Sequence, residues 1–590
     1  LLPDVDKQSS TAFPASPAKI SESDVTKDLL AKMGKLEKWG LQSFEGSNNW
    51  AVGGAKTKSG APIFCNDMHL GLNAPGLWYQ IHQHVEGKVN VTGVLLPGQP
   101  FIIAGHNEDI AWGMTNVMVD DMDFYEERIN ESGDKYEYLG EWHDLENVVE
   151  NIGLKGGGDT TITNYYTQRG PIISSLKGID DRWISMTWTG FGFSDELRSV
   201  YLLNRASNWD EFRDAVSTFR SVSQNVNYAD RFGNIGLHNC AGIPIRPDGM
   251  NGIDIYPGWT DEFNWKGIVP FEEQLYSFNP AENYVSSANN KTAVNDYPYP
   301  VSTWFALHYR IDRIRELLDS NDNITVEKMK TIQTDIESIF VREVKPLIIS
   351  NLIERNDLSD LEKNMLNKLL AWDNQVRKES AEAAVFELFY VNFLKNMMED
   401  ELGAELYVEY TKSSYLARYF MNNLVINEDS YYVDDITTEA VENLSDIMLK
   451  SYRQALAELK EKSSSNPDDW QWGDIHKLIL KHPLGSVKIL DRLFHFNTEP
   501  IPAQGSFHTV APCAYKLSDP FDVNHGASQR HIYTPDNWDN SFTVIPSGNS
   551  GIPASDHYCD QTKLYMDFKY HHDYFSLEKI KSAAKYEQKL

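Results

Sequence analysis

The alternation of apolar and polar residues divides the chain into segments with two different periods. Short runs rich in β-branched and aromatic residues, bounded by Gly, Pro and Asn, predict strands at 90–95 and 160–166. A helical period appears at 209–219 and then dominates from about 311 to 462. We therefore expect a strand-rich first part interrupted by one helix, followed by a mainly helical block.

The helical block also contains signals for where individual helices begin. Ser359 and Glu362 have the spacing of a capping box, in which each side chain bonds the backbone N–H of the other residue. A second apolar stripe predicts a helix over 441–459, and strand patterns return at 507–513 and 542–545. The pattern thus indicates a helical subdomain inserted into a strand-rich core.

Composition limits the classes of protein to which the chain can belong. With 590 residues it is long for a single core, and 41% hydrophobic residues suffice for a large globular interior. A net charge of −31 disfavours a nucleic-acid partner, because phosphate binding needs a basic surface. The best candidate for a membrane span, at 91–105, is broken by Pro97 and Pro100, so no membrane partner is expected.

Four cysteines lie far apart along the chain. Because no two of them form a Cys-x-x-Cys pair, zinc binding is not expected, while one disulfide of undefined pairing stays open. The four are Cys65, Cys240, Cys513 and Cys559. No signal peptide opens the sequence as it stands.

Residues 46–54, which begin Gly-Ser-Asn-Asn-Trp, carry the candidate nucleophile. A serine hydroxyl needs a base to take its proton, and no Gly-x-Ser-x-Gly elbow surrounds Ser47. A serine that becomes the first residue of a chain can instead use its own α-amine, whose pKa is roughly 7.7 to 8.0. That requires a cut after Gly46, where the missing Cβ permits a strained backbone. Without this chemistry the same residues are typical of a turn.

Several motifs, in order, resemble the β-chain of the penicillin acylase family. The resemblance starts at 47–52, continues through 66–71 and 105–116, and covers the chain from 47 to 590. Members of that family are N-terminal nucleophile amidohydrolases that are cut autocatalytically from one precursor. The later motifs that carry the resemblance are 228–236, 264–267, 470–476 and 557–561.

The resemblance implies an α+β fold, the four-layered αββα sandwich of N-terminal nucleophile (Ntn) hydrolases with an inserted helical subdomain. It assigns 1–46 to the end of the α-chain and a spacer peptide, 47–310 and 471–590 to the hydrolase core, and 311–470 to the helical subdomain. It also implies that an α-chain from the same precursor stays bound as a partner after processing. The family is exported, so an extracytoplasmic location, periplasmic or secreted, is expected.

The resemblance gives roles to four further residues near the nucleophile. The backbone N–H of Asn116 and the side-chain amide of Asn289 are expected to stabilise the oxyanion of the tetrahedral intermediate. His69 matches an auxiliary histidine of the cephalosporin acylase branch and is not expected to be the base. Arg310 matches an arginine that holds polar groups near the nucleophile, although a surface helix arginine is the alternative.

The positions that form the substrate pocket in penicillin G acylases hold different residues in this chain. That pocket is lined by phenylalanine, whereas the matching positions are Leu70 and Ala104, and Met114 stands where a small serine is found. A phenylacetyl preference therefore does not carry over. Aliphatic acyl chains, including those of acyl-homoserine lactones, and cephalosporin side chains stay open.

One structural calcium ion is also implied by the resemblance. Asp120, the backbone carbonyl of Met122 and Asp123 match its ligands, as suits a hard cation that prefers oxygen. The family completes the shell with an α-chain glutamate and one more β-chain aspartate. At that second position the chain has Pro300 or Val301, with Asp296 a few residues earlier. Without the family, an acidic run is typical of a solvated surface.

The expected function is hydrolysis of a linear N-acyl amide through an acyl-enzyme on Ser47. Its rivals are a different acyl substrate within the same family, and a non-catalytic homologue that keeps the fold as a binding protein. A chain with the Gly46–Ser47 bond intact has no free amine at Ser47 and is expected to be inactive.

Overall fold

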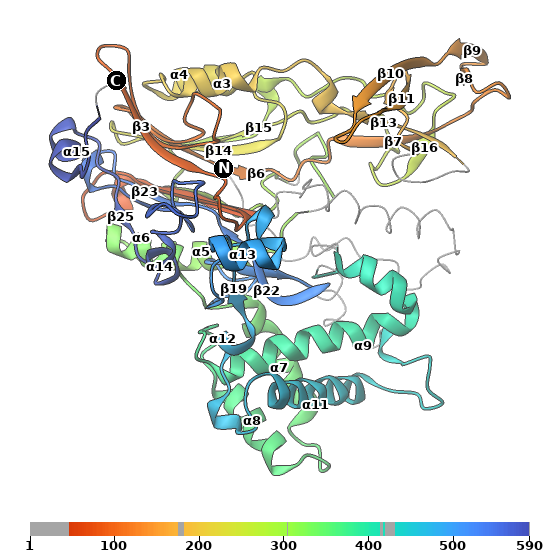
Figure 1. The fold of residues 1–590 in the computed structure, drawn as a ribbon, viewed down its shortest axis with the longest axis vertical. Helices are drawn as coiled ribbons and strands as arrows, with labels where there is room; N and C mark the ends of the chain where they lie inside the picture. The colour runs from red at the N-terminus through yellow and green to blue at the C-terminus, as the bar shows by residue number, and fades with distance from the viewer. Residues whose placement is uncertain are drawn as a thin grey trace.

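The structure is a computed structural model that describes residues 46–174, 182–294, 296–303, 305–412, 417–418 and 431–588. The segment expected to be the end of the α-chain lies outside the described residues, apart from Gly46. Figure 1 shows two large sheets in the upper half and a group of long helices in the lower half.

The first large sheet has seven antiparallel strands in the order β17-β15-β14-β6-β5-β4-β3. Its alternation is visible in β14, where Val226 and Tyr228 lie in an apolar cluster while Asn225 and Asn227 point to the other face. The strands are β3 (Tyr79–Val85), β4 (Val89–Leu95), β5 (Ala104–His106), β6 (Ile110–Asn116), β14 (Gln224–Asp230), β15 (Ile235–Cys240) and β17 (Tyr276–Phe278).

The second large sheet has ten strands drawn from the N-terminal, middle and C-terminal parts of the chain. Its strand β1 pairs with β18 on one side and β2 on the other, and all of its residues are buried. The strands are β1 (Gly46–Val52), β2 (Ile63–Gly71), β18 (Tyr284–Ser287), β19 (Lys477–Leu478), β20 (Ile501–Pro502), β21 (Cys513–Lys516), β22 (Asp519–Ala527), β23 (Arg530–Tyr533), β24 (Phe542–Val544) and β25 (His571–His572).

The two sheets face each other and are covered by helices on their outer sides. Small residues meet between the sheets, with Ala51 of β1 in one buried cluster with Ala111 of β6. Helices α3 (Glu196–Leu203) and α4 (Trp209–Val216) cover the seven-stranded sheet, and α5 (Tyr309–Asp319) and α6 (Val326–Gln333) cover the other. The layer order is therefore helix, sheet, sheet, helix (Figure 1).

A smaller β-rich region extends from one end of the seven-stranded sheet, at the upper right of Figure 1. It contains one three-stranded sheet of β13, β7 and β16, another of β10, β11 and β12, and the hairpin of β8 and β9. Its strands are β7 (Met122–Glu127), β8 (Lys135–Tyr138), β9 (Glu141–Asp144), β10 (Glu146–Gly153), β11 (Asp159–Thr167), β12 (Gly170–Pro171), β13 (Trp183–Trp188) and β16 (Ile255–Pro257).

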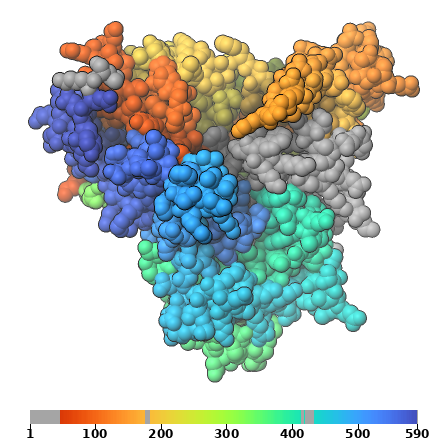
Figure 2. All heavy atoms as spheres, in the orientation of Figure 1, coloured from red at the N-terminus to blue at the C-terminus, as the bar shows by residue number. Residues whose placement is uncertain are grey.

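The long helices share a separate buried core. They are α7 (Ile339–Leu352), α8 (Asp360–Ala371), α9 (Ala381–Lys412) and α11 (Leu444–Lys462), with α9 kinked at Gly403, whose φ is 72°. Four short helices complete the described chain: α12 (Trp472–Ile475), α13 (Lys488–Phe494), α14 (Thr562–Met566) and α15 (Leu577–Ala583). In Figure 2 the long helices form the lower lobe.

Most predicted elements are confirmed, with shifts at their ends. The capping box of Ser359 and Glu362 is present at the start of α8. The helix predicted at 441–459 begins only at Leu444, because Asn443 caps it, and Val441 is 85% exposed.

The strand predicted at 507–513 is wrong. Of that segment only Cys513 belongs to a strand. The hydroxyl of Thr509 donates to the carbonyls of Ser506 and Ala511, and such local bonds hold the backbone in turns rather than in a ladder. Phe507 and Pro512 of this turn segment line the same cavity as Gly46.

All four cysteines are free thiols, so the disulfide left open by the sequence is not formed. Among the described helices, none combines the length and apolar character needed to cross a membrane.

Candidate functional site

Strand β1 begins at the candidate cleavage site. Gly46 and Ser47 stand opposite His69 and Met68 of β2, and only 4% of Ser47 is exposed. The Ser47 hydroxyl donates a hydrogen bond to the carbonyl oxygen of Gly46. In the uncut chain the candidate nucleophile therefore lies against the carbonyl group that it would attack.

Asn289 reaches the same point from the end of β18. Strand β18 pairs with β1 and brings Ser287 opposite Asn49, two residues from the nucleophile. Asn289 has a φ of 64°, a left-handed conformation that asparagine adopts more readily than most residues. Its Oδ1 accepts from the backbone N of Ser47 at 2.6 Å, and its Nδ2 donates to the carbonyl of Asn116 at 3.0 Å. The structure thus places Asn289 against Ser47 and Asn116 against Asn289.

Arg310, in the first turn of α5, is buried and not on the helix surface, so the surface alternative is wrong. Its Nη1 donates to the carbonyl of Ser47 at 2.9 Å and to Oδ1 of Asn48 at 2.8 Å, and its Nη2 donates to Oδ1 of Asn289 at 3.1 Å. Hydrogen bonds from a guanidinium are stronger than those between neutral groups. Arg310 therefore holds β1 and Asn289 together.

His69 lies beside Gly46. A Cβ on residue 46 would come within 3.1 Å of its Nδ1, which is a physical reason for glycine at this position. Its Nε2 is 2.6 Å from Oδ2 of Asp67. Burial, with the nearby cations of Arg310 and Arg530, holds the pKa of His69 well below its usual value, so the ring is neutral.

Asp67 is a buried partner that the sequence analysis missed. Its Oδ2 accepts from Asn48 at 2.9 Å and its Oδ1 from Gln333 at 3.1 Å. Burial raises the pKa of Asp67 to about 8, although Arg530 and these hydrogen bonds lower it. The available signal was spacing, since Asp67 and His69 are two residues apart on one strand and share a face.

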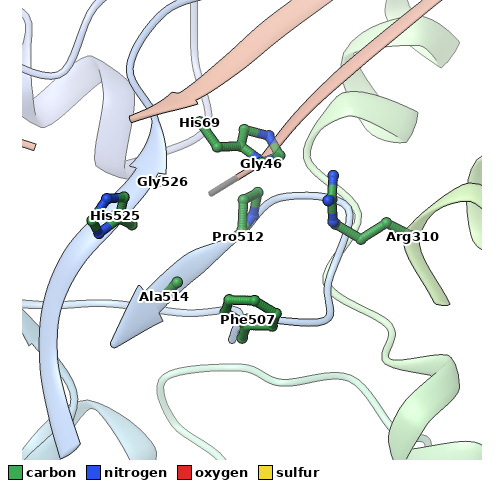
Figure 3. Close-up of a pocket in the computed structure, with 8 residues that line it drawn as sticks. All are labelled: Gly46, His69, Arg310, Phe507, Pro512, Ala514, His525 and Gly526. Atoms are coloured by element: carbon green, nitrogen blue, oxygen red, sulfur yellow. The ribbon is translucent and has the colours of Figure 1, made fainter. Parts of the chain in front are cut away.

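A small cavity lies beside Gly46, which is one of the residues that line it (Figure 3). The Arg310 and His69 side chains border it near Gly46, and Phe507, Pro512 and His525 close it from the C-terminal part of the chain. These last residues were missed because they lie more than 400 positions away, and Phe507 and Pro512 fall in the segment predicted to be a strand. The remaining lining residues are Ala514 and Gly526.

The three predicted pocket residues do not line this cavity. Leu70, Ala104 and Met114 are buried together in the apolar cluster that also contains Met68, the residue opposite Ser47 in the β1–β2 register. They are therefore packed in the interior, in the cluster on the side of β1 toward which Ser47 points.

The predicted calcium ligands lie in and next to β7. Arg246 contacts both carboxylates, with its Nε 2.8 Å from Oδ2 of Asp123 and its Nη2 3.2 Å from Oδ1 of Asp120. Met122 pairs with Trp188 in the β7–β13 ladder. The described part of the chain has no group of three or more His, Cys, Asp or Glu placed to bind a metal ion. As arranged, these residues do not fit a calcium shell.

The chain is similar to a known protein family and to several known proteins. The family model described as penicillin amidase matches residues 5–582. Acyl-homoserine lactone acylase QuiP of Pseudomonas aeruginosa is 26% identical over 569 residues, which covers 89% of this chain and 66% of that protein. Penicillin acylase 2 proenzyme of Pseudomonas sp. (strain SE83) is 27% identical over 561 residues, covering 92% and 69%.

The fold is also similar to a solved structure. A thermostable penicillin G acylase from Alcaligenes faecalis superposes with a TM-score of 0.70 at 20% identity, covering 92% of this chain and 99% of that chain. The chain spans 66% of the length of the QuiP relative, just under two thirds.

Proposed function

Since the chain belongs to the penicillin amidase family, we propose that it hydrolyses a linear amide through an acyl-enzyme on Ser47. The observation that carries the proposal is the contact of the Ser47 hydroxyl with the carbonyl of Gly46, beside Asn289 and Arg310. The order helix, sheet, sheet, helix supports the finer assignment to the αββα sandwich of Ntn hydrolases, with 311–470 contributing the helical subdomain. Within that range, however, α6 and most of α5 belong to an outer layer of the sandwich.

The first reaction is cleavage of the chain itself. Oγ of Ser47 attacks the carbonyl carbon of Gly46, and the C–N bond between the two residues breaks. The hydroxyl proton passes to the released nitrogen, and an ester joins Gly46 to Oγ. Water then hydrolyses the ester, which leaves a carboxylate on Gly46 and a free α-amine on Ser47. That amine becomes the base for later turnovers.

In each later turnover, Oγ of Ser47 attacks the acyl carbonyl while the α-amine takes the hydroxyl proton and passes it to the leaving amine. The backbone N–H of Asn116 and Nδ2 of Asn289 stabilise the oxyanion. One hydrogen of Nδ2 is used by the Asn116 carbonyl, so the second can reach the oxyanion. Water then releases the acid from the enzyme.

The α-amine must be neutral to act as the base. With a pKa of roughly 7.7 to 8.0, it loses its proton as the pH rises through that range, so we expect kcat of the processed enzyme to rise there. A pH profile of the processed enzyme tests this; a kcat that is already at its plateau at pH 6 would contradict the α-amine as base.

In this scheme, Asp67 determines which ring nitrogen of His69 carries the proton. Above a pH of about 8 Asp67 is a carboxylate that only accepts, so Nε2 of His69 must donate and Nδ1 faces Gly46 as an acceptor. We expect cleavage of the precursor to quicken as the pH rises through about 8. Asp67→Asn should slow cleavage by about 100-fold and remove this step.

A time course of precursor cleavage at several pH values measures both effects. Asp322→Asn is the control, because Asp322 pairs with Lys56 at the surface, where its side chain is 84% exposed. Equal rates and pH profiles for Asp67→Asn and the unaltered chain would exclude this role of Asp67.

The acyl group of the substrate is proposed to be aliphatic. Leu70, Ala104 and Met114 lie together in an apolar cluster, with no phenylalanine among the three, and one relative is named an acyl-homoserine lactone acylase. A penicillin or cephalosporin side chain is the second candidate, favoured by the relative named penicillin acylase 2 proenzyme. We also propose that the α-chain of the precursor stays bound as a partner, and that the protein works outside the cytoplasm.

The experiment is intact-mass spectrometry with N-terminal sequencing of protein expressed from its full-length precursor. A fragment that begins at Ser47, followed by hydrolysis of acyl-homoserine lactones in preference to penicillin G and cephalosporin amides, is the expected result. A precursor that stays whole at Gly46–Ser47 would exclude the mechanism and favour the non-catalytic binding homologue.

A further inference from the structure

Asp120 and Asp123 share a single cationic partner, Arg246, which follows β15. Besides the two ion pairs, Nη2 of Arg246 donates to the backbone carbonyl of Asp120 at 3.0 Å. The Arg246 side chain is 6% exposed, and that of Asp123 is 0% exposed. The guanidinium therefore lies between the two carboxylates in a largely buried site, in which the Asp120 side chain is 17% exposed.

Neighbouring side chains supply further donors to these carboxylates, although Oδ1 of Asp123 is buried without a hydrogen-bond partner. Nε1 of Trp265 donates to Oδ2 of Asp123 at 2.5 Å. The neighbouring carboxylate of Asp121 accepts from Nε1 of Trp188 at 3.2 Å and from the hydroxyl of Thr189 at 3.3 Å. All three acidic residues of the segment thus have donors from the protein itself.

Among the described residues, no carboxylate stands at the second β-chain position that the family uses for its calcium ion. Where the family supplies a second β-chain aspartate, Val301 is buried in an apolar cluster, and its carbonyl accepts from the backbone N of Asp120 at 2.9 Å. Asp296, the nearby acidic residue, is exposed. Calcium takes 6 to 8 oxygen ligands, and a guanidinium between the two carboxylates would repel it.

We propose that Arg246 takes the structural place of the calcium ion, so that the protein folds and stays folded without calcium. The planar guanidinium suits two carboxylates, since its several N–H groups form a fixed fork. The bridge joins the segment after β15 to the residues that follow β6. Because β6 ends at Asn116, four residues before Asp120, the bridge also anchors the strand that carries the proposed oxyanion donor.

The test uses the full-length protein and measures bound calcium by elemental analysis and thermal unfolding with calcium or EDTA. We expect less calcium than one ion per chain, and a Tm that neither EDTA nor saturating calcium changes. Neither measurement depends on enzymatic activity. One calcium ion per chain, or a Tm lowered by EDTA, would overturn the proposal whatever the variants do.

Variants of Arg246 test the bridge itself. Arg246→Ala leaves two buried carboxylates without their cation and should lower Tm by about 5 °C or more. Arg246→Lys keeps the charge but loses the fork, so it should recover part of the loss. Arg342→Ala is the control, because Arg342 pairs with Glu316 at the surface, where both side chains are more than 40% exposed.

The proposal fails if Arg246→Ala lowers Tm no more than Arg342→Ala. If Arg246→Ala does not fold, Arg246→Lys answers the same question. An Arg246→Lys protein as stable as the unaltered chain would show that the guanidinium is not required.

Discussion

Replacement of Ser47 by alanine is expected to leave the precursor uncut and to remove amide hydrolysis, by about 10⁶-fold or to the detection limit. Alanine lacks the hydroxyl that lies against the Gly46 carbonyl, so neither the ester with Gly46 nor the acyl-enzyme can form. Folding should be unaffected, because Ser47 is small and its backbone N still bonds Asn289. Intact-mass spectrometry over time, followed by an amide hydrolysis assay, measures both losses.

Ser59→Ala is the matched control for this variant, since Ser59 is an exposed serine in the same part of the chain. It should be cut at the normal rate. Cleavage of the Ser47→Ala chain between residues 46 and 47 would show that another group, or another protein, performs the cut.

Asn289→Asp should reduce kcat by about 10²- to 10³-fold, with a much smaller effect on KM. The change keeps the shape of the side chain but replaces the donor Nδ2 with an oxygen, which cannot stabilise an oxyanion. The fold should persist, because aspartate also tolerates a φ of 64° and the added charge faces Arg310. Steady-state kinetics on the processed enzyme give kcat and KM separately.

Asn283→Asp is the control for the conformation, since Asn283 has a similar φ of 58° but lies outside the site. It should leave kcat unchanged. An Asn289→Asp enzyme with normal kcat would remove Asn289 from the oxyanion site and leave it only the contacts to Ser47 and Arg310.

The chain of contacts at the site explains why these two variants should have the largest effects. Ser47 and Asn289 are 242 positions apart, yet the Ser47 backbone N donates directly to the Asn289 side chain. Arg310 bonds both residues from a third element, α5. The nucleophile and its donor are therefore positioned by one rigid junction of β1, β18 and α5, and a change in either acts on the reacting atoms.

The sequence by itself determined the local elements and the residues of the candidate junction. A helix buries one face, so α8 was readable from the apolar period of its own residues. Strands β4 and β11 were readable from β-branched and aromatic runs bounded by Gly, Pro and Asn. The pair Gly46–Ser47 was identified through the family resemblance of the motifs that follow it, because Gly-Ser-Asn-Asn alone is typical of a turn.

Only the tertiary structure decided which distant residues complete each site. The burial of Arg310, the partnership of Asp67 with His69, and the contribution of Phe507 to the cavity depend on how β1, β2 and the C-terminal strands pair. The replacement of the metal ion by Arg246 depends on the approach of two segments more than 120 positions apart. The packing of whole layers determines which remote segments pair. The apolar period of a single segment does not show which segment it pairs with.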